Sequence, residues 1–462
     1  MSAGLRPRPI HLVGVGGAGM SALARLAALA GYRVSGTDRS DGPAMEALRA
    51  LGVDARAGHD ASAVPPDAAL VVVSTAIAPD TPDLAEARRR GLPVVHRADL
   101  LAELMRGRRG LAVAGAHGKS TTSAMLALAL GDVSACVGAA IPGGGGTGAR
   151  WGEGPWFVAE ADESDRSLLR LDPEAVVLLN VDHDHHATFA SLAEVEEVFA
   201  RFLERIPPHG VVVAGPDPRA RALASAAGRP WRAVGPGGDW WVEERGPGGA
   251  VLAARDGRRV TVPLAVPGAH NAANAACALA LAEWCGVPPA DAAARLAGFT
   301  GVGRRFEVRG TAGGVTVIDD YAHHPAEVAA TLAAARERTG GRIVAVFQPH
   351  LPSRTRALWR ELGEALGAAD VAVVTDVYLA REPADPAVTG RLVAGAVPPP
   401  ARAVHAPTLA EARDAALAEA RPGDMVLTLG AGDVTALGQD LMRALENQAP
   451  DGGDPGDARS PA

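Results

Sequence analysis

The sequence contains almost no lysine. Of its 45 lysine and arginine residues, 44 are arginine and one, Lys119, is lysine. Richness in alanine and arginine is typical of a GC-rich genome, which encodes arginine wherever either cation serves. An ammonium is a compact point charge, whereas a guanidinium is a wide planar fork. We therefore expect Lys119 to occupy a position where arginine would not serve.

Other features that are scarce exclude several classes of protein. Three scattered cysteines, Cys136, Cys277 and Cys285, are too few for a disulfide framework or a structural zinc site. No apolar run approaches the ~18 residues of a membrane span, and residues 1–9 lack the apolar core of a signal peptide. The net charge is -8 and no basic stripe is present, which argues against nucleic-acid binding. We expect a soluble, cytoplasmic protein that binds neither nucleic acid nor membrane and is a monomer or a weak homodimer.

The 462 residues suggest about three domains. Short apolar runs alternate with alanine-rich helical segments, a rhythm that predicts an α/β fold with parallel sheets. We place an N-terminal domain at residues 1–107, a central domain at 108–304, a C-terminal domain at 305–447 and a disordered tail at 448–462. An antiparallel excursion is expected within 231–266. The expected strands are 9–13, 32–34, 70–73, 111–114, 156–159, 176–179, 211–213, 314–318, 343–347, 371–375 and 425–429, and the expected helices include 20–30, 121–130 and 272–285.

The first glycine loop follows the first expected strand and opens the first expected helix. Its residues are Gly14, Val15, Gly16, Gly17, Ala18, Gly19 and Met20. In this context glycines let the backbone approach a pyrophosphate at a helix N-terminus, and Asp38, at the end of the next strand, can accept a bond from a ribose hydroxyl. Alone, the loop favours a dinucleotide dehydrogenase over another nucleotide diphosphate or a mere tight turn. NAD and UDP-sugars share a pyrophosphate and a ribose, so the loop cannot choose between them.

The second glycine loop carries the lysine. It comprises Gly115, Ala116, His117, Gly118, Lys119, Ser120 and Thr121. The spacing is shorter than the usual phosphate loop, but a strand precedes Gly-Lys-Ser and a helix follows it. Backbone N–H groups would hold phosphates, Lys119 would neutralise the β and γ oxygens, and the Ser120 hydroxyl would bind Mg²⁺. The alternative is a turn with one chance lysine.

Acidic and histidine-rich segments follow the next two strands. Glu160, Asp162 and Asp165 follow the strand at 156–159, where open α/β sheets place their ligands. The segment Asn180 to His186 follows the strand after it. Carboxylates with one or two imidazoles suit Mg²⁺. A zinc site on the three neighbouring histidines and simple solvated charge at Asp162 and Asp165 are the alternatives.

Further polar groups follow later strands or open later helices. Asn271 and Asn274 lie one turn apart and can present amides to a purine edge, with helix capping as the alternative for Asn271. Arg305 stands at the expected boundary between the central and C-terminal domains, where a guanidinium could reach across a closing cleft. Polar residues around His323 and Arg354 also follow expected strands.

Taken in order, these motifs resemble those of the Mur ligases. The matching runs are Gly-x-His-Gly-Lys-Ser-Thr, Glu-Ala-Asp-Glu-Ser-Asp, Asn-x-x-x-Asp-His, His-Asn-x-x-Asn-Ala, Arg-Arg-Phe-Glu and Asp-Asp-Tyr-x-His-His-Pro. With the first glycine loop, the likeness extends over residues 10–440. So many ordered matches are far more specific than either glycine loop alone.

The resemblance implies a three-domain architecture and a reaction. The domains would be a Rossmann-like UDP-sugar-binding domain, a central phosphate-loop ATPase domain and a Rossmann-like C-terminal domain. An ATP-dependent ligase would join L-alanine to the carboxylate of UDP-N-acetylmuramate through an acyl phosphate, a step of peptidoglycan precursor synthesis. A recycling ligase that attaches a peptide, a non-catalytic sensor of the same nucleotides and, distantly, a dehydrogenase are the alternatives.

The resemblance also assigns roles to individual residues. Lys119, Glu160 and His185 become catalytic, and Ser120, Glu160 and His185 become Mg²⁺ ligands. The second glycine loop with Asn271, Asn274 and Arg305 becomes the ATP site. The substrate-binding residues become Gly16, Gly17, Ala18, Gly19, Met20, Asp38, Ser74, Thr75, His323 and Arg354.

This sequence departs from the family pattern at a few positions. Ser120 stands where the family usually has threonine and keeps the hydroxyl, so metal binding should survive. Ala187 and Phe189 replace an acid and a tyrosine, which puts any role of that pair in doubt. Sister ligases carry a carbamylated lysine near a second metal. With no second lysine this chemistry is impossible here, which favours the alanine-adding branch.

Overall fold

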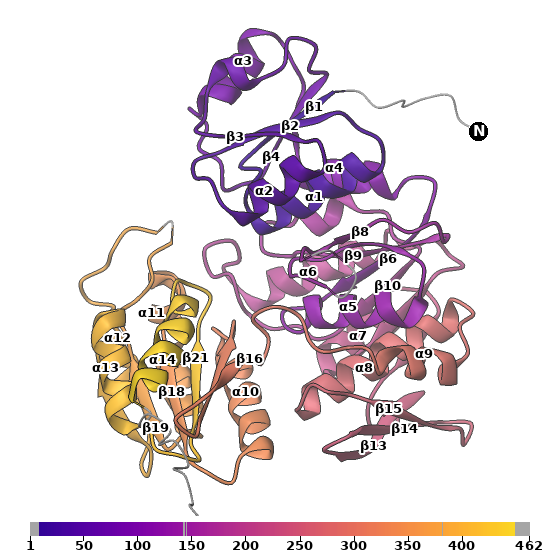
Figure 1. Ribbon diagram of the computed structural model, residues 1–462. Coiled ribbons are helices and arrows are strands. Elements are labelled where there is room, and N and C mark those ends of the chain that lie inside the picture. Colours follow the sequence, from indigo (N-terminus) through magenta and orange to yellow (C-terminus); the bar gives the residue numbers. More distant parts are fainter. Residues whose placement is uncertain (1–8, 142–143, 145, 381, 449–462) are drawn as a thin grey trace, which may run out of the picture. The chain divides into compact units, whose positions relative to one another are not determined.

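The computed structural model describes residues 9–141, 144, 146–380 and 382–448, shown in Figure 1. These residues form two compact units that divide between Gly303 and Arg304, with residues 267–269 grouped with the second unit. The predicted disordered tail lies outside the described residues from residue 449 onward. No helix in the described part of the chain is long and apolar enough to cross a membrane.

The N-terminal part of the first unit is a parallel sheet with the strand order β3-β2-β1-β4-β5. Its strands are β1 (Ile10–Val13), β2 (Val34–Asp38), β3 (Asp54–Ala57), β4 (Leu70–Val73) and β5 (Val94–His96). Its helices are α1 (Ala18–Leu29), α2 (Pro43–Ala50), η1 (Ala61–Ala63), α3 (Pro82–Arg89) and α4 (Arg97–Met105). The order reverses between β1 and β4, and ligands of open parallel sheets bind at such a switch point, at the strand carboxyl ends.

The central sheet has the order β12-β11-β10-β6-β9-β7-β8 over the described residues. Its strands are β6 (Arg109–Ala114), β7 (Ser134–Cys136), β8 (Ala149–Arg150), β9 (Trp156–Glu160), β10 (Ala175–Leu178), β11 (Val211–Ala214) and β12 (Trp231–Ala233). Only the β7–β8 pair is antiparallel among them. The helices of this part are α5 (Lys119–Leu130), η2 (Ser167–Arg170), α6 (Leu192–Leu203), α7 (Pro218–Ala226), α8 (Ala269–Trp284) and α9 (Pro289–Leu296). Because β6 lies between β9 and β10, the loops after these three strands meet at one edge.

A small antiparallel sheet completes the first unit. It consists of β13 (Trp240–Gly246), β14 (Gly249–Ala254) and β15 (Arg259–Pro263) in the order β13-β14-β15. The predicted antiparallel excursion is therefore correct for 240–263. It is wrong for β12, which pairs in parallel with β11 and extends the central sheet.

The second unit is a sheet with the order β16-β17-β21-β18-β19-β20 over its described residues. Its strands are β16 (Glu307–Ala312), β17 (Val315–Asp320), β18 (Ile343–Phe347), β19 (Val371–Val374), β20 (Arg402–His405) and β21 (Met425–Leu429). Its helices are α10 (Pro325–Arg338), α11 (Pro352–Leu366), α12 (Gly390–Gly395), α13 (Leu409–Glu419) and α14 (Thr435–Gln448). Only β16, the first edge strand, runs antiparallel to its neighbour.

Most of the predicted elements are confirmed to within a few residues. The strands at 70–73, 343–347 and 425–429 have the predicted bounds, and the helix at 121–130 begins at Lys119. The strand predicted at 32–34 is wrong in its position, because β2 begins at Val34 and continues to Asp38. Its interior residues Ser35, Gly36 and Thr37 are polar or small, so the sequence gives no apolar run there.

Candidate active site

The second glycine loop connects β6 to α5 and is braced by the loop after β10. Asn180 accepts a hydrogen bond from the His117 backbone N–H at 2.8 Å and donates one to the His117 carbonyl at 3.0 Å. Gly115 and Gly118 have φ values of +134° and +83°, which disfavour other residues. A Cβ at Gly115 would lie 3.1 Å from the Asn180 backbone. The two glycines are therefore required by the fold of the loop.

Lys119 lies against its own loop and a buried carboxylate. Its Nζ donates to the carbonyls of Gly115 at 2.7 Å and Ala116 at 3.1 Å, and lies 3.0 Å from Glu163. Its side chain is 14% exposed. Burial disfavours the charged ammonium, but the carboxylates of Glu163 and its acidic neighbours outweigh burial and raise the pKa of Lys119. Lys119 is thus a charged group held inside the loop.

Ser120 and Glu160 are brought together, as predicted for two ligands of one metal. The Ser120 hydroxyl donates to the Glu160 carboxylate, with its Oγ 3.0 and 2.9 Å from the two oxygens. The Gly138 backbone N–H donates to the same carboxylate at 2.6 Å. A hydroxyl and a carboxylate are the oxygen donors that Mg²⁺ prefers. The donor set therefore fits Mg²⁺.

The third predicted metal ligand, His185, lies at Glu163. Its Nε2 is 3.5 Å from Glu163 and 3.7 Å from Asp184. Burial favours the neutral ring, but the hydrogen bond to Glu163 and the nearby carboxylates raise the pKa of His185. Its described contacts do not include Glu160. Glu163 therefore joins Lys119 and His185, a link that the sequence analysis did not assign.

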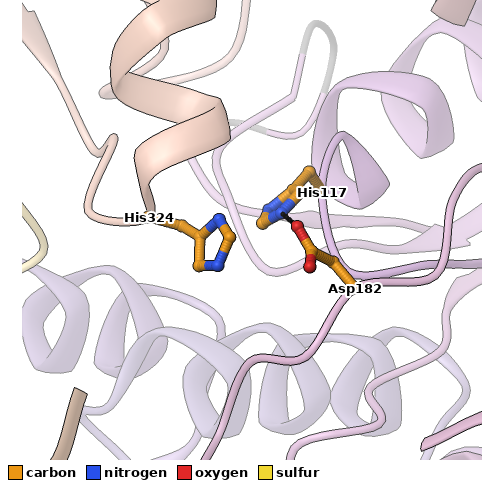
Figure 2. Close-up of side chains that lie close together, drawn as sticks. All are labelled: His117, Asp182 and His324. Carbon is orange, nitrogen blue, oxygen red and sulfur yellow. Dashed lines mark hydrogen bonds and ion pairs between the residues drawn. The ribbon is translucent and has the colours of Figure 1, made fainter. Parts of the chain in front are cut away.

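The neighbouring residues explain how the loop after β10 is held. His117 Nε2 lies 3.3 Å from the Asp182 carboxylate. Figure 2 shows the two side chains pointing toward each other. Phe189, one of the departures from the family pattern, is 1% exposed and packs under the Arg166 guanidinium. A phenyl ring needs no hydrogen-bond partner in that position, so the loss of a hydroxyl there leaves no polar group unsatisfied.

A cavity of about 330 Å³ adjoins the second glycine loop. Asn180 and Asn274 line it, together with Asp217, His270 and Ala273. A Cβ at Gly118 would lie 3.0 Å from the Asn274 side chain, so Asn274 also contacts the glycine loop. Asn271 is buried and is not among the lining residues. The two predicted amides therefore occupy different surroundings.

The first glycine loop is closed by the carboxylate predicted to bind ribose. Asp38 accepts a hydrogen bond from the Gly16 N–H at 2.9 Å and one from the Ser40 N–H at 3.2 Å. Gly17, Ala18 and Gly19 are exposed at the start of α1. The side chain of Met20, which was predicted to bind substrate, is buried in the core. Ser74 and Thr75 follow β4 and so lie on the same sheet edge as the first glycine loop.

The predicted residues of the second unit form one polar group. Arg305 pairs with Glu327 at 3.1 Å, and the His323 backbone N–H donates to Glu327 at 3.2 Å. Arg354 is 3% exposed and its Nη1 lies 3.1 Å from His350 Nδ1. The ring centroids of His323 and His350 are 5.9 Å apart. Glu327 and His350, which the sequence analysis did not assign, therefore hold together the residues that it did.

Three protein-family models match consecutive parts of the chain. The model described as "Mur ligase family, catalytic domain" matches residues 9–109, the "Mur ligase middle domain" matches 156–282, and the "Mur ligase, glutamate ligase domain" matches 304–432. The chain belongs to the Mur ligase family. The predicted family and its α/β architecture are thus confirmed.

Relatives of known name match almost the whole Mur ligase chain. The UDP-N-acetylmuramate–L-alanine ligase of Streptomyces avermitilis is 45% identical over 95% of this chain and 97% of its own. That of Kineococcus radiotolerans is 47% identical over 94% and 96%. The solved UDP-N-acetylmuramate–alanine ligase of Thermotoga maritima has a TM-score of 0.80 at 26% identity and covers 95% of this chain and 99% of its own.

Proposed function

We propose that this Mur ligase joins L-alanine to the carboxylate of UDP-N-acetylmuramate at the expense of ATP. ATP phosphorylates the carboxylate, the alanine amine attacks the acyl phosphate, and the tetrahedral intermediate collapses to an amide. ADP and phosphate are the other products. A carboxylate is a poor electrophile, and phosphorylation supplies the leaving group that amide formation needs.

The observation that carries the proposal is the arrangement around Lys119. Lys119 and Ser120 are adjacent residues of one glycine loop, and each contacts a carboxylate from the segment at the end of β9: Lys119 pairs with Glu163, and the Ser120 hydroxyl donates to Glu160. Both pairs lie at the edge where the loops after β6, β9 and β10 meet. Phosphoryl transfer is catalysed chiefly by positioning and by charge stabilisation. The high identity to relatives named as alanine ligases supports the same reaction.

Different residues of this chain would bind the phosphates, the nucleoside and the metal ion of ATP. Backbone N–H groups of the second glycine loop would bind phosphates, and Lys119 would neutralise the group being transferred. The cavity beside Asn274 would take the nucleoside, with Arg305 as a further contact from the C-terminal domain. Ser120, Glu160 and His185 would hold Mg²⁺. A bound Mg²⁺ would neutralise charge on the phosphates.

Substrate binding would use the first glycine loop and the second unit. Gly16 to Gly19 and Asp38 would bind the diphosphate and a ribose, and Ser74 and Thr75 would line the same edge. His323 and Arg354 would contact the reacting muramoyl and alanine groups. We keep the domain boundaries at 107/108 and 304/305 as part of this proposal, with the UDP-sugar, ATP and C-terminal domains in that order.

A ligase that attaches a whole peptide is the second candidate. The solved murein peptide ligase of Psychrobacter arcticus has a TM-score of 0.72 at 23% identity, which shows a shared fold alone. The alanine-ligase relatives reach 42–47% identity over nearly the full chain. The comparisons therefore favour alanine as the amine, and a dehydrogenase leaves the second glycine loop unexplained.

A substrate-panel assay of ADP release tests the proposal. Wild-type protein is incubated with ATP and Mg²⁺, with and without UDP-N-acetylmuramate, and with L-alanine, glycine, L-serine or the tripeptide as amine. We expect release only when UDP-N-acetylmuramate and L-alanine are both present, with glycine and serine slower. ADP release that ignores either substrate, or that prefers the tripeptide, would contradict the proposed reaction.

A further inference from the structure

Arg97 lies on the N-terminal part of the first unit and contacts the central part. It begins α4 directly after β5, so it stands at the carboxyl edge of the N-terminal sheet, as the first glycine loop does. Its Nη2 donates to Asp162 at 2.8 Å and lies 3.6 Å from Asp165. The adjacent His96 pairs with Asp165 at 3.3 Å. The guanidinium is therefore anchored by the acidic loop that follows β9.

The other terminal nitrogen of the guanidinium, Nη1, lies near the first glycine loop. A Cβ at Gly19 would lie 3.9 Å from Arg97 Nη1, and no other described atom outside the adjacent residues and the helix's own backbone would lie within 4 Å of it. Gly19 is exposed, and the Arg97 side chain is 26% exposed. Among the described residues Arg97 donates one hydrogen bond, through Nη2. Its Nη1 thus lies beside the backbone that we assign to the nucleotide sugar.

We propose that Arg97 binds the diphosphate of the nucleotide sugar through Nη1, which lies beside Gly19, while Asp162 holds Nη2. The inference rests on the proposed function, because it adds a residue to the sugar-nucleotide site. A guanidinium suits the task, since it can pair with a carboxylate on one edge and with phosphate oxygens on another. The glycine loop supplies neutral N–H groups only, so Arg97 supplies a full positive charge at this edge.

A purely structural role for Arg97 would be to tie the two sheets together. Arg170 already does this, because it pairs with Asp99 of α4 at 2.7 Å and lies on η2 of the central part. Its described contacts do not include the first glycine loop. Arg170 therefore offers a matched control: it is an arginine that joins the same two parts of the chain, and its described contacts do not include Gly19.

Calorimetric titration with UDP and with uridine tests the inference directly. We expect Arg97→Met to weaken UDP binding about 10- to 100-fold, the scale of a lost hydrogen bond to a charged group. Uridine carries no phosphate, so its affinity should stay within about twofold. Arg97→Lys should restore part of the UDP affinity, and Arg170→Met should bind both ligands as wild type does. Unchanged UDP affinity in Arg97→Met, or an equal loss for UDP and uridine, would overturn the inference.

A kinetic measurement separates this inference from the proposed function. In the ligase assay, Arg97→Met should raise the KM for UDP-N-acetylmuramate by the same factor and leave the KM for ATP within about twofold. A wild-type protein that shows Arg97-dependent UDP binding but no ligation would overturn the proposed reaction and leave the site standing. An active wild type with an equally active Arg97→Met would overturn the site alone.

Discussion

Replacing Lys119 by arginine keeps the charge of the second glycine loop and changes its shape. The lysine Nζ lies within 3.1 Å of two loop carbonyls and of Glu163, and its side chain is only 14% exposed. A guanidinium spreads its charge over a plane, so it cannot place that charge at the point where Nζ meets these three acceptors. We expect Lys119→Arg to fold, because the new side chain can still pair with Glu163, but with its charge displaced from the phosphates.

The expected loss in kcat follows from the displacement of the positive charge away from the phosphates. Moving a unit charge from about 3 Å to about 4.5 Å from a phosphoryl oxygen lowers the attraction by about 2 kcal/mol at an effective dielectric constant of about 20. That difference is worth roughly 20- to 30-fold in rate. Both the transferred group and the neighbouring phosphate carry charge, so the total loss in kcat should be at least about 100-fold, the scale of removing one preorganised donor.

Steady-state ADP release and thermal melting check this prediction together. Lys119→Arg should melt within a few degrees of wild type, which separates lost chemistry from lost folding. Lys119→Met removes the charge outright and should be slower still. Arg166→Lys is the matched control. Arg166 directly follows the acidic segment Glu160 to Asp165, is exposed, and pairs with Glu194 of α6. A Lys119→Arg variant that folds and turns over at a near-normal rate would refute the reasoning.

Three further predictions test other parts of the molecule. Glu160→Gln weakens the donor set at Ser120, so it should raise the Mg²⁺ concentration for half-maximal activity at least about tenfold, with the ATP-free melting temperature little changed; an unaltered Mg²⁺ dependence would contradict the assignment. Burial raises the pKa of the thiols of Cys136, Cys277 and Cys285 to about 12. Native protein should therefore resist iodoacetamide at pH 8, and denatured protein should react fully. Burial raises the pKa of Asp320 to about 6. The protonated carboxyl therefore stabilises the folded protein at a pH below the ordinary pKa of aspartate, and this stabilisation is lost as the pH rises through about 6. Wild type should therefore lose melting temperature relative to Asp320→Asn between about pH 4 and pH 6, and parallel curves for the two proteins would contradict this shift.

Local sequence signals were enough to predict the elements that carry the glycine loops. A short apolar run, glycines and an alanine-rich segment mark β1 with α1 and β6 with α5, and the structure has both pairs. These signals are local, because strand, turn and helix follow one another within a few residues. Strands such as β2 and β12 were misplaced because their residues are polar, small or exposed and form no apolar run.

The long-range hydrogen bonds that hold the site could not be predicted from local sequence signals. Asn180 holds His117 from 63 positions away, and Gly138 holds Glu160 from 22 positions away. Such contacts depend on the order of strands in the sheet, and chain order does not give it. Once β6 is known to lie between β9 and β10, the loops after these strands must meet, and the asparagine becomes a candidate brace for the glycine loop.

The contrast between Lys119 and Glu163 shows why composition identified one partner and not the other. Lysine is so rare in this chain that its position alone carries information, whereas Glu163 is one of four acidic residues within six positions, Glu160 to Asp165. The structure distinguishes Glu160 from Glu163. Glu160 ends β9 and accepts a hydrogen bond from Ser120, while Glu163 lies beyond the strand, 3.0 Å from Lys119. Burying the lysine demands a buried counter-charge, because an unpaired ammonium there would lose its proton. A buried Lys119 therefore needs a carboxylate partner, and the fold shows that this partner is Glu163.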